Sequence, residues 1–285
     1  MKKIFRFLCL SLFWMLAAIP AGADEEENLS IKTESRLIAS STIDDVFGEI
    51  EISESKFSAT YGYNLPNLLP ITLGFNIKHT EINEDLAAEY PSHLEARSFQ
   101  VGTKFPIPFM ELENYYMGVD VFPTMNTDGW EWEDSAFRMP FRTYLIYKPE
   151  EKFILVAGVS VRIDYDDTVL PLFGLIYKPN DRLSFNLASD NPNVSYKLND
   201  QFTTFAEFDY ARDEYEVTQN GQKGVILKYR QSSAGAGLKY EPTKFLEASV
   251  ATGLVLGRRI EYEDSSDKIE PESAPYVKAA LELKF

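Results

Sequence analysis

The 285-residue sequence contains one cysteine and two histidines, so it has few of the side chains that most often bind metals or act as nucleophiles. Cys9 lies in an apolar segment near the start and lacks the small-residue context that lipoprotein processing requires. No other cysteine is present to form a disulfide or a catalytic thiolate. The sequence also has no G-x-S-x-G motif, no metal-binding histidine pair and no phosphate-binding loop. We therefore predict no cofactor, no metal site, no catalytic residue and no enzyme activity.

The sequence also lacks long apolar runs and an excess of basic residues. After residue 23 no stretch approaches roughly 18 consecutive apolar residues, which excludes membrane-spanning helices. Lys and Arg number 28 against 44 Asp and Glu, which gives a formal net charge of −16. Because nucleic-acid binding depends on basic side chains that neutralise phosphates, we do not expect nucleic acid as a partner.

The amino terminus has the order of a secretory signal peptide: basic residues, an apolar run and small residues before a cleavage site. Basic residues within positions 2–6 precede the apolar run 7–19, and the small residues 21–23 follow it. The run of about 13 residues is shorter than the roughly 20 that a spanning helix needs; an uncleaved anchor helix is the alternative. We expect cleavage after Ala23, which leaves 262 residues with a formal charge of −19 and a short acidic leader at 24–28.

The carboxyl-terminal segment 274–285 alternates between apolar and polar side chains. Odd positions from Pro275 are apolar and end on Phe285, whereas the even positions from Tyr276 are mostly polar. Because successive side chains of a strand point to opposite faces, the segment is predicted to be a strand with one apolar face.

This terminal segment resembles the closing strand of bacterial outer-membrane β-barrels, which the barrel-assembly machinery recognises. That signal has a polar residue, a small residue two positions later, and two hydrophobic residues of which the last is aromatic. Lys278, Ala280, Leu283 and Phe285 fill these places, with alanine where glycine is more usual. The resemblance implies a barrel in the outer membrane of a Gram-negative bacterium. Its expected partners are outer-membrane lipid, lipopolysaccharide and the barrel-assembly machinery.

The sequence before it divides into segments with a rough period of two, each bounded by Gly, Pro, Asn or Asp. With the terminal strand they are 30–39, 48–63, 70–81, 95–105, 113–122, 137–148, 152–163, 169–178, 182–188, 193–198, 201–211, 224–240, 245–260 and 274–285. Most are long enough to cross a membrane as tilted strands, which takes roughly 9–11 residues. We therefore predict an all-β, transmembrane, antiparallel up-and-down β-barrel of about 14 strands over residues 24–285. Twelve strands is the alternative, because the first strand and the pair within 182–198 are weak; a soluble β-sandwich would need two domains at this length.

Connection lengths support the barrel independently of the strand pattern. With both termini in the periplasm, the connections after returning strands are short: 149–151, 179–181, 199–200 and 241–244. Those after outgoing strands are longer on average: 82–94, 123–136, 212–223 and 261–273. Transmembrane barrels combine short periplasmic turns with longer outer loops and aromatic girdles, and tyrosines such as Tyr63 and Tyr240 fall at predicted periplasmic ends. Within 224–240 the apolar residues change phase, which predicts a bulge near Ser232.

A second resemblance covers about 30 residues in the middle of the chain. The run Pro171-Leu-Phe-Gly-Leu-Ile-Tyr-Lys-Pro-Asn-Asp-Arg-Leu183, followed by Asn191-Pro192, Val194 and Tyr196, is similar to a bacterial outer-membrane barrel family known only as a domain of unknown function. The resemblance implies a barrel, and it transfers no activity and no catalytic residue.

Charged residues on the polar faces of the predicted strands are expected to point into the lumen, because a charge facing lipid at mid-membrane costs roughly 2–4 kcal/mol. The candidate pore-lining residues are Lys78, Asp120, Arg142, Arg162, Glu207, Asp209, Lys228 and Arg230. Arg142, Lys228 and Arg230 lie near mid-strand and are expected to form a constriction that favours anions. The alternative is that the basic side chains pair with carboxylates, including those of infolded loops, and fill the lumen.

Three functional hypotheses follow from this pattern. The first is a passive channel for small solutes with a basic lumen. The second is a structural barrel with a plugged lumen, whose acidic outer loops bind divalent cations such as calcium or magnesium. These acidic segments are 131–134, 164–167, 213–216 and 261–264, and solvated loops are their simpler interpretation. The third is an outer-membrane lipid hydrolase, because His79 has outward parity near the outer rim; a lone histidine there is more often an interface residue.

Overall fold

In the computed structural model, the described residues are 28–43, 46–64, 69–84, 90–107, 114–131, 133–163, 165–166, 168–188, 192–263 and 268–285. The predicted signal peptide at 1–23 and most of the predicted leader at 24–28 lie outside them. In this part of the chain, no helix has the length and apolar character needed to cross a membrane.

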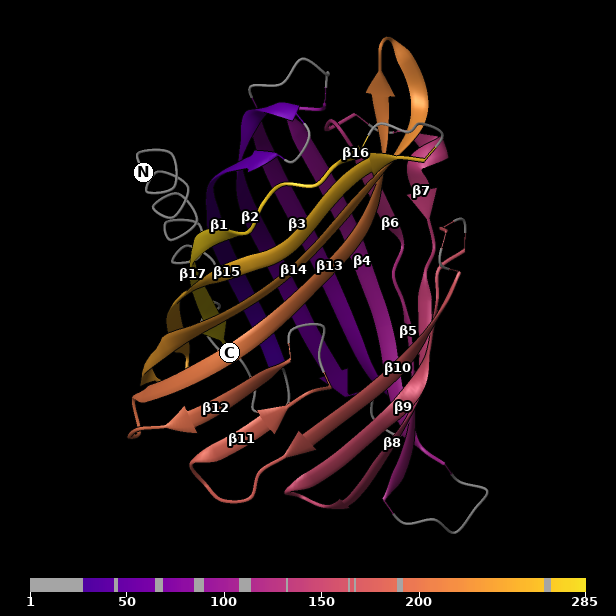
Figure 1. Cartoon of the computed structure of the whole chain (residues 1–285). Coiled ribbons are helices and arrows are strands. Elements are labelled where there is room, and N and C mark those ends of the chain that lie inside the picture. Colours follow the sequence, from indigo (N-terminus) through magenta and orange to yellow (C-terminus); the bar gives the residue numbers. More distant parts are fainter. Residues whose placement is uncertain are drawn as a thin grey trace.

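The described chain forms one sheet of seventeen strand segments that closes on itself, antiparallel except for a single bridge between Glu216 and Thr127 (Figure 1). The segments are β1 (Asn28–Ile43), β2 (Val46–Asn64), β3 (Pro70–Glu84), β4 (His93–Pro106), β5 (Tyr115–Val121), β6 (Thr124–Thr127), β7 (Phe137–Arg138), β8 (Phe141–Glu150), β9 (Phe153–Val161), β10 (Val169–Tyr177), β11 (Leu183–Asn186), β12 (Asn193–Lys197), β13 (Phe202–Gln219), β14 (Gln222–Thr243), β15 (Leu246–Tyr262), β16 (Lys268–Ile269) and β17 (Ala274–Lys284), with the short 3-10 helix η1 (Asp134–Ala136). β1 pairs with both β2 and β17, which closes the ring.

Three of these segments do not count as separate strands of the wall, because they are short pieces next to a strand break or within a connection. β5 and β6 follow one path along β4 and are separated at Pro123, and β7 and β8 are separated at Pro140. Proline has no amide hydrogen to donate to the ladder, so strands break at such positions. β16 is a two-residue piece between β15 and β17. The wall therefore has fourteen strands, and the predicted barrel is confirmed.

The terminal strand closes the barrel in the predicted orientation. Leu29 and Phe285 exchange two backbone hydrogen bonds, with N to O distances of 3.2 and 2.8 Å. On β17, Val277 is 61% exposed on the outer face, whereas Tyr276 is 2% exposed and points inward. Apolar side chains thus face outward on this strand, and its polar ones face the interior. We call the end of the barrel near Leu29 and Phe285 the turn end, and the other the hairpin end.

An apolar belt surrounds the half of the barrel nearest the turn end. Its outward residues include Leu73, Phe99, Val101, Leu155 and Phe173, each at least 40% exposed. Aromatic rings edge the belt at the turn end, where Tyr115 stacks on Tyr147 at 4.5 Å and Phe202 stacks on Tyr240 at 4.9 Å between ring centroids. These rings lie where a membrane-spanning barrel has its girdle of amphipathic side chains.

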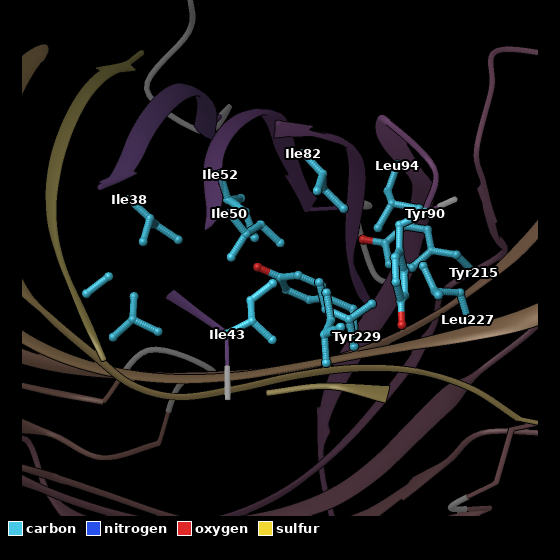
Figure 2. Packing of buried hydrophobic residues seen from close by; sticks show 14 of the residues in the cluster. Ile38, Ile43, Ile50, Ile52, Ile82, Tyr90, Leu94, Tyr215, Leu227 and Tyr229 are labelled. Atoms are coloured by element: carbon cyan, nitrogen blue, oxygen red, sulfur yellow. The ribbon is translucent and has the colours of Figure 1, made fainter. Parts of the chain in front are cut away.

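Toward the hairpin end the alternation reverses, and the interior is apolar. Ile50 and Ile52 on β2 pack inward against Tyr215, Leu227 and Tyr229 from β13 and β14, and each is at most 1% exposed (Figure 2). Burying each side chain of this size stabilises the fold by about 1.5–3 kcal/mol. The walls β1–β4 and β13–β15 therefore pack face to face here, as in a β-sandwich.

A bulge does lie near Ser232 in the pairing of β14 with β15, but the prediction that it shifts the phase of β14 is wrong. β14 pairs with β13 without a shift from Tyr240 to Val225, so β14 keeps its phase. The apolar residues of β14 change face because its surroundings change from lipid outside to a packed core inside. The shift lies in β15 instead, where Ser232 and Ser233 pair with Gly257 and Val255.

The predicted loop at 212–223 is also wrong, since β13 continues to Gln219 and β14 begins at Gln222. Asn220 and Gly221 join them with φ values of 48° and 78°. Both residues are in the left-handed region, as a two-residue type I′ hairpin turn requires. The resulting hairpin projects beyond the other strands (Figure 1).

Candidate functional site

The interior carries charged side chains that bond to each other across the barrel. Arg36 on β1 lies 3.1 Å from Asp209 on β13 and 3.6 Å from Glu54 on β2. Lys78 on β3 lies 3.0 Å from Asp213 on β13 and 3.2 Å from Glu54. Arg36 and Glu54 are almost fully buried. These contacts join β1–β3 to β13 directly beneath the apolar core of the hairpin end.

A second inward group lies nearer the turn end, around Glu207 on β13. Its carboxylate accepts hydrogen bonds from Lys278 Nζ at 2.5 Å and from the Tyr276 hydroxyl at 3.2 Å. The Arg36 guanidinium lies 4.0 Å from the centroid of the Tyr276 ring. The two groups thus form one continuous polar network on this side of the lumen.

A cavity of about 200 Å³ adjoins this network on β1–β4. Lys32 and Lys56 lie 3.4 and 3.7 Å from Glu34, and the two ammonium groups share this one carboxylate. Asn76 and Ser98 also line the cavity. Water and small polar solutes therefore have room beside the charged wall.

The inner face of the opposite wall has one polar cluster at Asp120. The Asp120 carboxylate bonds to the Tyr144 hydroxyl and lies 3.5 Å from Gln100 Nε2. Arg142 lies 4.8 Å from the Phe122 ring. A Cβ added at Gly118 would lie 2.4 Å from the Tyr144 ring, so glycine at this position makes room for the tyrosine.

Apart from Ser160, the inner face of β9 and β10 is apolar. Register places Leu172 opposite Gly158 and Leu170 opposite Ser160, with Ile154 and Val156 continuing the same face of β9. The outer face carries Phe173, which is 80% exposed. These two strands are therefore apolar on both sides, in contrast to the charged walls β1–β3 and β13.

Strand pairing weakens where β10 meets β13. β10 pairs with β11 through only Ile176 and Tyr177, and β12 pairs with β13 only between Thr203 and Glu207. In the part of the chain that the structure describes, Val169–Gly174 of β10 and Asp209–Tyr215 of β13 have a paired strand on one side alone. β11 and β12 are short and stay near the turn end (Figure 1). We call this interrupted stretch of wall the β10–β13 opening.

Arg162 and Asp166, in the connection 162–168, bridge the opening on its hairpin-end side. Arg162 donates to the Arg212 carbonyl at 3.2 Å, and the Asp166 amide donates to Glu214 at 3.3 Å. The Lys228 ammonium bonds to the Asp166 carboxylate. Through this hydrogen bond, the ammonium holds the pKa of Asp166 below its ordinary value. These contacts mark the hairpin-end edge of the opening.

On the outer face, a histidine and a carboxylate meet just beyond the apolar belt. His79 Nδ1 on β3 contacts Glu95 Oε1 on β4, and the Glu95 side chain is 0% exposed. Ser55 on β2 is the cross-strand partner of His79. The three residues form one row across three neighbouring strands.

Residues 123–278 match the family model described as "Domain of unknown function (DUF6268)", which is more than half of the chain. The chain belongs to the DUF6268 family. A search of the curated proteins finds no match.

The DUF6268 barrel is similar in structure to outer-membrane channels. The COG4313 outer membrane channel from Pseudomonas putida F1 is 10% identical at a TM-score of 0.50, with 94% of this chain and 100% of that chain covered. A Pseudomonas aeruginosa FadL homologue is 10% identical at a TM-score of 0.48, with 92% and 90% covered. At 10% identity, the likeness to the COG4313 channel shows the fold alone.

The DUF6268 barrel places most of the candidate pore-lining residues inside. Lys78, Asp120, Arg142, Glu207 and Asp209 point inward, and Arg162 lies at the edge of the β10–β13 opening with its guanidinium over the Tyr165 ring.

Lys228 and Arg230 lie elsewhere. They are on the opposite face of β14 from Leu227 and Tyr229, beside Glu263 and Glu261. Lys228 and Arg230 therefore do not form the predicted constriction, because the apolar core occupies the inner face of β14 at this height.

The sequence does not predict several residues of the charged network and of the outer row. Arg36 and Glu54 occupy the centre of the charged network, and Asp213, which the sequence predicts in an outer acidic loop, pairs with Lys78. The inward parity of β1 is the signal that could have identified Arg36. The sequence also does not predict Ser55 and Glu95 as neighbours of His79, because only strand register reveals that they flank it.

The acidic segments are largely bonded to basic or hydroxyl groups of the chain. Glu216 bonds to Ser135 at 2.5 Å, Glu133 to Lys223 at 3.1 Å and Glu261 to Arg259 at 2.5 Å. Among the described residues, no three His, Cys, Asp or Glu side chains are arranged to hold a metal ion.

Proposed function

We propose that this DUF6268 protein is a passive channel for small solutes in the outer membrane of a Gram-negative bacterium. One observation carries the proposal: near the turn end, the outer face of the wall is apolar and the inner face is charged. Outward residues such as Leu73 and Val101 are apolar, whereas Lys56 and Glu207 point inward. Because a lipid-facing charge costs roughly 2–4 kcal/mol at mid-membrane, this arrangement fits a lipid-embedded barrel with a polar interior.

The route of the solute follows from the distribution of side chains within the lumen. The apolar core of Tyr215 and Tyr229 fills the interior at the hairpin end between β1–β4 and β13–β15. The apolar inner face of β9 and β10 adjoins the β10–β13 opening. We therefore propose that small apolar or amphipathic solutes pass along β9 and β10 and use this opening.

Charge in the lumen is proposed to be nearly balanced, with a positive excess only locally at Lys32 and Lys56. Lys78, Lys278 and Arg36 are each bonded to carboxylates, which removes most of the predicted excess of positive charge. Lys32 and Lys56 share Glu34 and leave a local excess of one positive charge. Selectivity for anions is thus expected to be modest.

Conductance across planar bilayers tests the channel itself. Refolded protein is expected to give discrete conductance steps, and their absence from folded protein would refute the channel proposal.

Fluorescence quenching by lipids with brominated acyl chains tests the lateral route. In the predicted mature chain 24–285 with Trp130 and Trp132 changed to Phe, which removes all three tryptophans of the sequence, Leu172→Trp is expected to be quenched if the opening meets lipid. Phe173→Trp, on the outer face, is the quenched control, and Ser98→Trp, on the inner wall of β4, is the unquenched control. Conductance without quenching at position 172 would leave the channel intact and overturn the lateral route.

A structural barrel with a filled lumen is the second candidate, and the buried core at the hairpin end favours it. In that case the folded protein conducts little. If its acidic outer segments bind divalent cations in addition, its midpoint of thermal unfolding is expected to rise with calcium.

Outer-membrane lipid, lipopolysaccharide and the barrel-assembly machinery remain the proposed partners. We propose that the assembly machinery recognises Lys278, Ala280, Leu283 and Phe285. Deleting Phe285 should reduce the amount of assembled barrel in cells while leaving refolding in detergent unchanged.

A further inference from the structure

The row formed by Ser55, His79 and Glu95 lies on the outer face of the barrel. Strand register sets Ser55 opposite His79 and His79 opposite Glu95. Their chain neighbours Glu54 and Lys78 pair with each other in the interior, and Leu94, next to Glu95, is buried in the core, so the row faces outward. The apolar residues Phe57 and Ile77 stand two positions nearer the turn end on the same face. The row therefore lies at the edge of the apolar belt, where headgroups and acyl esters of membrane lipids meet the wall.

The histidine and the carboxylate in this row form an oriented pair. Glu95 Oε1 contacts His79 Nδ1, and Glu95 is fully buried while the His79 side chain is 39% exposed. A buried carboxylate that accepts from Nδ1–H fixes the tautomer in which Nε2 is free to act as a base. The imidazole therefore covers the carboxylate, and part of the imidazole ring remains exposed.

Barrel stability does not explain this carboxylate. Arg97 lies two residues along β4 on the same face, yet its guanidinium donates to the carbonyls of Gly129 at 2.7 Å and Trp130 at 3.0 Å. The second oxygen of Glu95, Oε2, is buried without a hydrogen-bond partner. A buried acceptor without a partner lowers the stability of the fold by about 1–3 kcal/mol or more. Stability therefore does not account for a carboxylate at this position.

Ser55 supplies the third group. Side chains directly opposed on one face of an antiparallel pair have Cβ atoms roughly 4.5–5.5 Å apart, so rotation about χ1 brings the hydroxyl within reach of the imidazole. Catalytic hydrogen bonds are often long before substrate binds. We propose that Ser55, His79 and Glu95 form a hydrolytic site for acyl esters of membrane lipids, an activity separate from the channel.

The reaction assigned to these groups has two steps. Ser55 Oγ attacks the ester carbonyl carbon while His79 Nε2 takes the hydroxyl proton, and the carbon–oxygen bond to the alcohol breaks as His79 returns that proton to the leaving oxygen. Water then attacks the acyl-serine, His79 takes the proton of the water, and Ser55 Oγ regains it on leaving. The products are a fatty acid and an alcohol. Glu95 accepts from His79 Nδ1 and stabilises the imidazolium.

A fluorophosphonate probe tests the nucleophile without knowledge of the natural lipid. In this reaction Ser Oγ forms a bond to phosphorus and fluoride leaves. We expect the refolded full-length protein to be labelled at Ser55, as located by mass spectrometry, with labelling at least about 100-fold slower in His79→Asn and slowed in Glu95→Gln. Ser53→Ala and Ser35→Ala provide matched controls on the same face and should label at the normal rate.

Hydrolysis of phosphatidylethanolamine in mixed micelles provides the second measurement. Ser55→Ala and His79→Asn should lose fatty-acid release while keeping the conductance and circular dichroism spectrum of the unaltered barrel. Failure of folded protein to label at Ser55, or equal labelling in His79→Asn, would overturn the hydrolytic site. Neither result would bear on the channel, because conductance is measured on the same preparations.

Discussion

Arg36 on β1 and Asp209 on β13 form an ion pair of 3.1 Å that crosses the interior of the barrel. Arg36 is 4% exposed, so removing its partner leaves a buried charge incompletely compensated. Breaking a buried pair by changing one member costs about 3–5 kcal/mol. We expect Asp209→Ala to lower the free energy of unfolding by about 3 kcal/mol, measured by urea unfolding in detergent.

The exposed pair formed by Lys197 and Asp200 provides the matched control for this prediction. Its ions are 3.0 Å apart, but Asp200 is 99% exposed. Exposed pairs contribute about 0–1 kcal/mol, so Asp200→Ala should change the stability little. Equal effects of the two substitutions would contradict a cross-barrel role for Arg36 and Asp209.

Arg142 and Arg230 are expected to differ in their effect on ion selectivity, although the sequence predicts the same role for both. Arg142 lies on the inner wall beside Phe122, whereas Arg230 lies on the face of β14 turned away from Tyr229 and pairs with Glu261. Arg142→Glu should shift the reversal potential in a salt gradient toward cation preference. Arg230→Glu should leave it unchanged, and a shift of the same size in both would place Arg230 in the conducting path.

Sequence reasoning succeeds for this barrel where the environment of a strand is uniform. On β17 the polar and apolar faces stay constant, so Tyr276 and Val277 are assigned correctly. It fails on β14, because Leu227 and Tyr229 are apolar for a different reason from Leu238 and Tyr240. The first pair fills a core and the second faces outward with the belt.

The candidate site could be predicted only in part, for a related reason. Parity places Lys78 and Glu207 inside, but no local pattern states that Lys78 meets Asp213, which is 135 residues away. Likewise, the outward parity of His79 is readable from the sequence, whereas its neighbours depend on register between separate strands. Long-range pairing of this kind is determined by closure of the ring rather than by any single segment.

The outer face of β17 provides a test of the lipid contact. Val277 is 61% exposed and faces outward within the apolar belt. We expect Val277→Arg to lower the stability in lipid bilayers by roughly 2–4 kcal/mol if the residue lies near the membrane centre. Ser53→Arg, which changes an outward residue beyond the belt, should cost no more than about 1 kcal/mol. Urea unfolding in vesicles measures both, and similar costs would place the belt elsewhere.

The connection 162–168 should be insensitive to moderate acid. The pKa of Asp166 is lowered from its ordinary value of 3.8 by its hydrogen bond to Lys228. A carboxylate with a lowered folded pKa stabilises the folded state above its unfolded pKa, and this contribution is lost as the pH falls through the folded value. Hydrogen exchange of the Arg162 amide, corrected for the intrinsic rate, should therefore show the same protection at pH 7 and pH 5. Asp166→Asn should reduce that protection at both, whereas Asp181→Asn, a change in a turn at the other end of β10, should not.

The hairpin turn between β13 and β14 allows a test in which backbone conformation acts alone. Gly221 has a φ of 78°, and a Cβ added there would meet no atom within 4 Å. Gly221→Ala therefore introduces no clash, and its cost comes from placing an L-residue in the left-handed region, about 1–2 kcal/mol. Gly129 is the matched control, because a Cβ there also meets nothing within 4 Å and its φ is not in that region. We expect urea unfolding to show a loss of about 1 kcal/mol for Gly221→Ala and almost none for Gly129→Ala. Because Tyr215 and Val217 enter the core from the same hairpin, equal losses at the two glycines would mean that the turn does not fix the register of these strands.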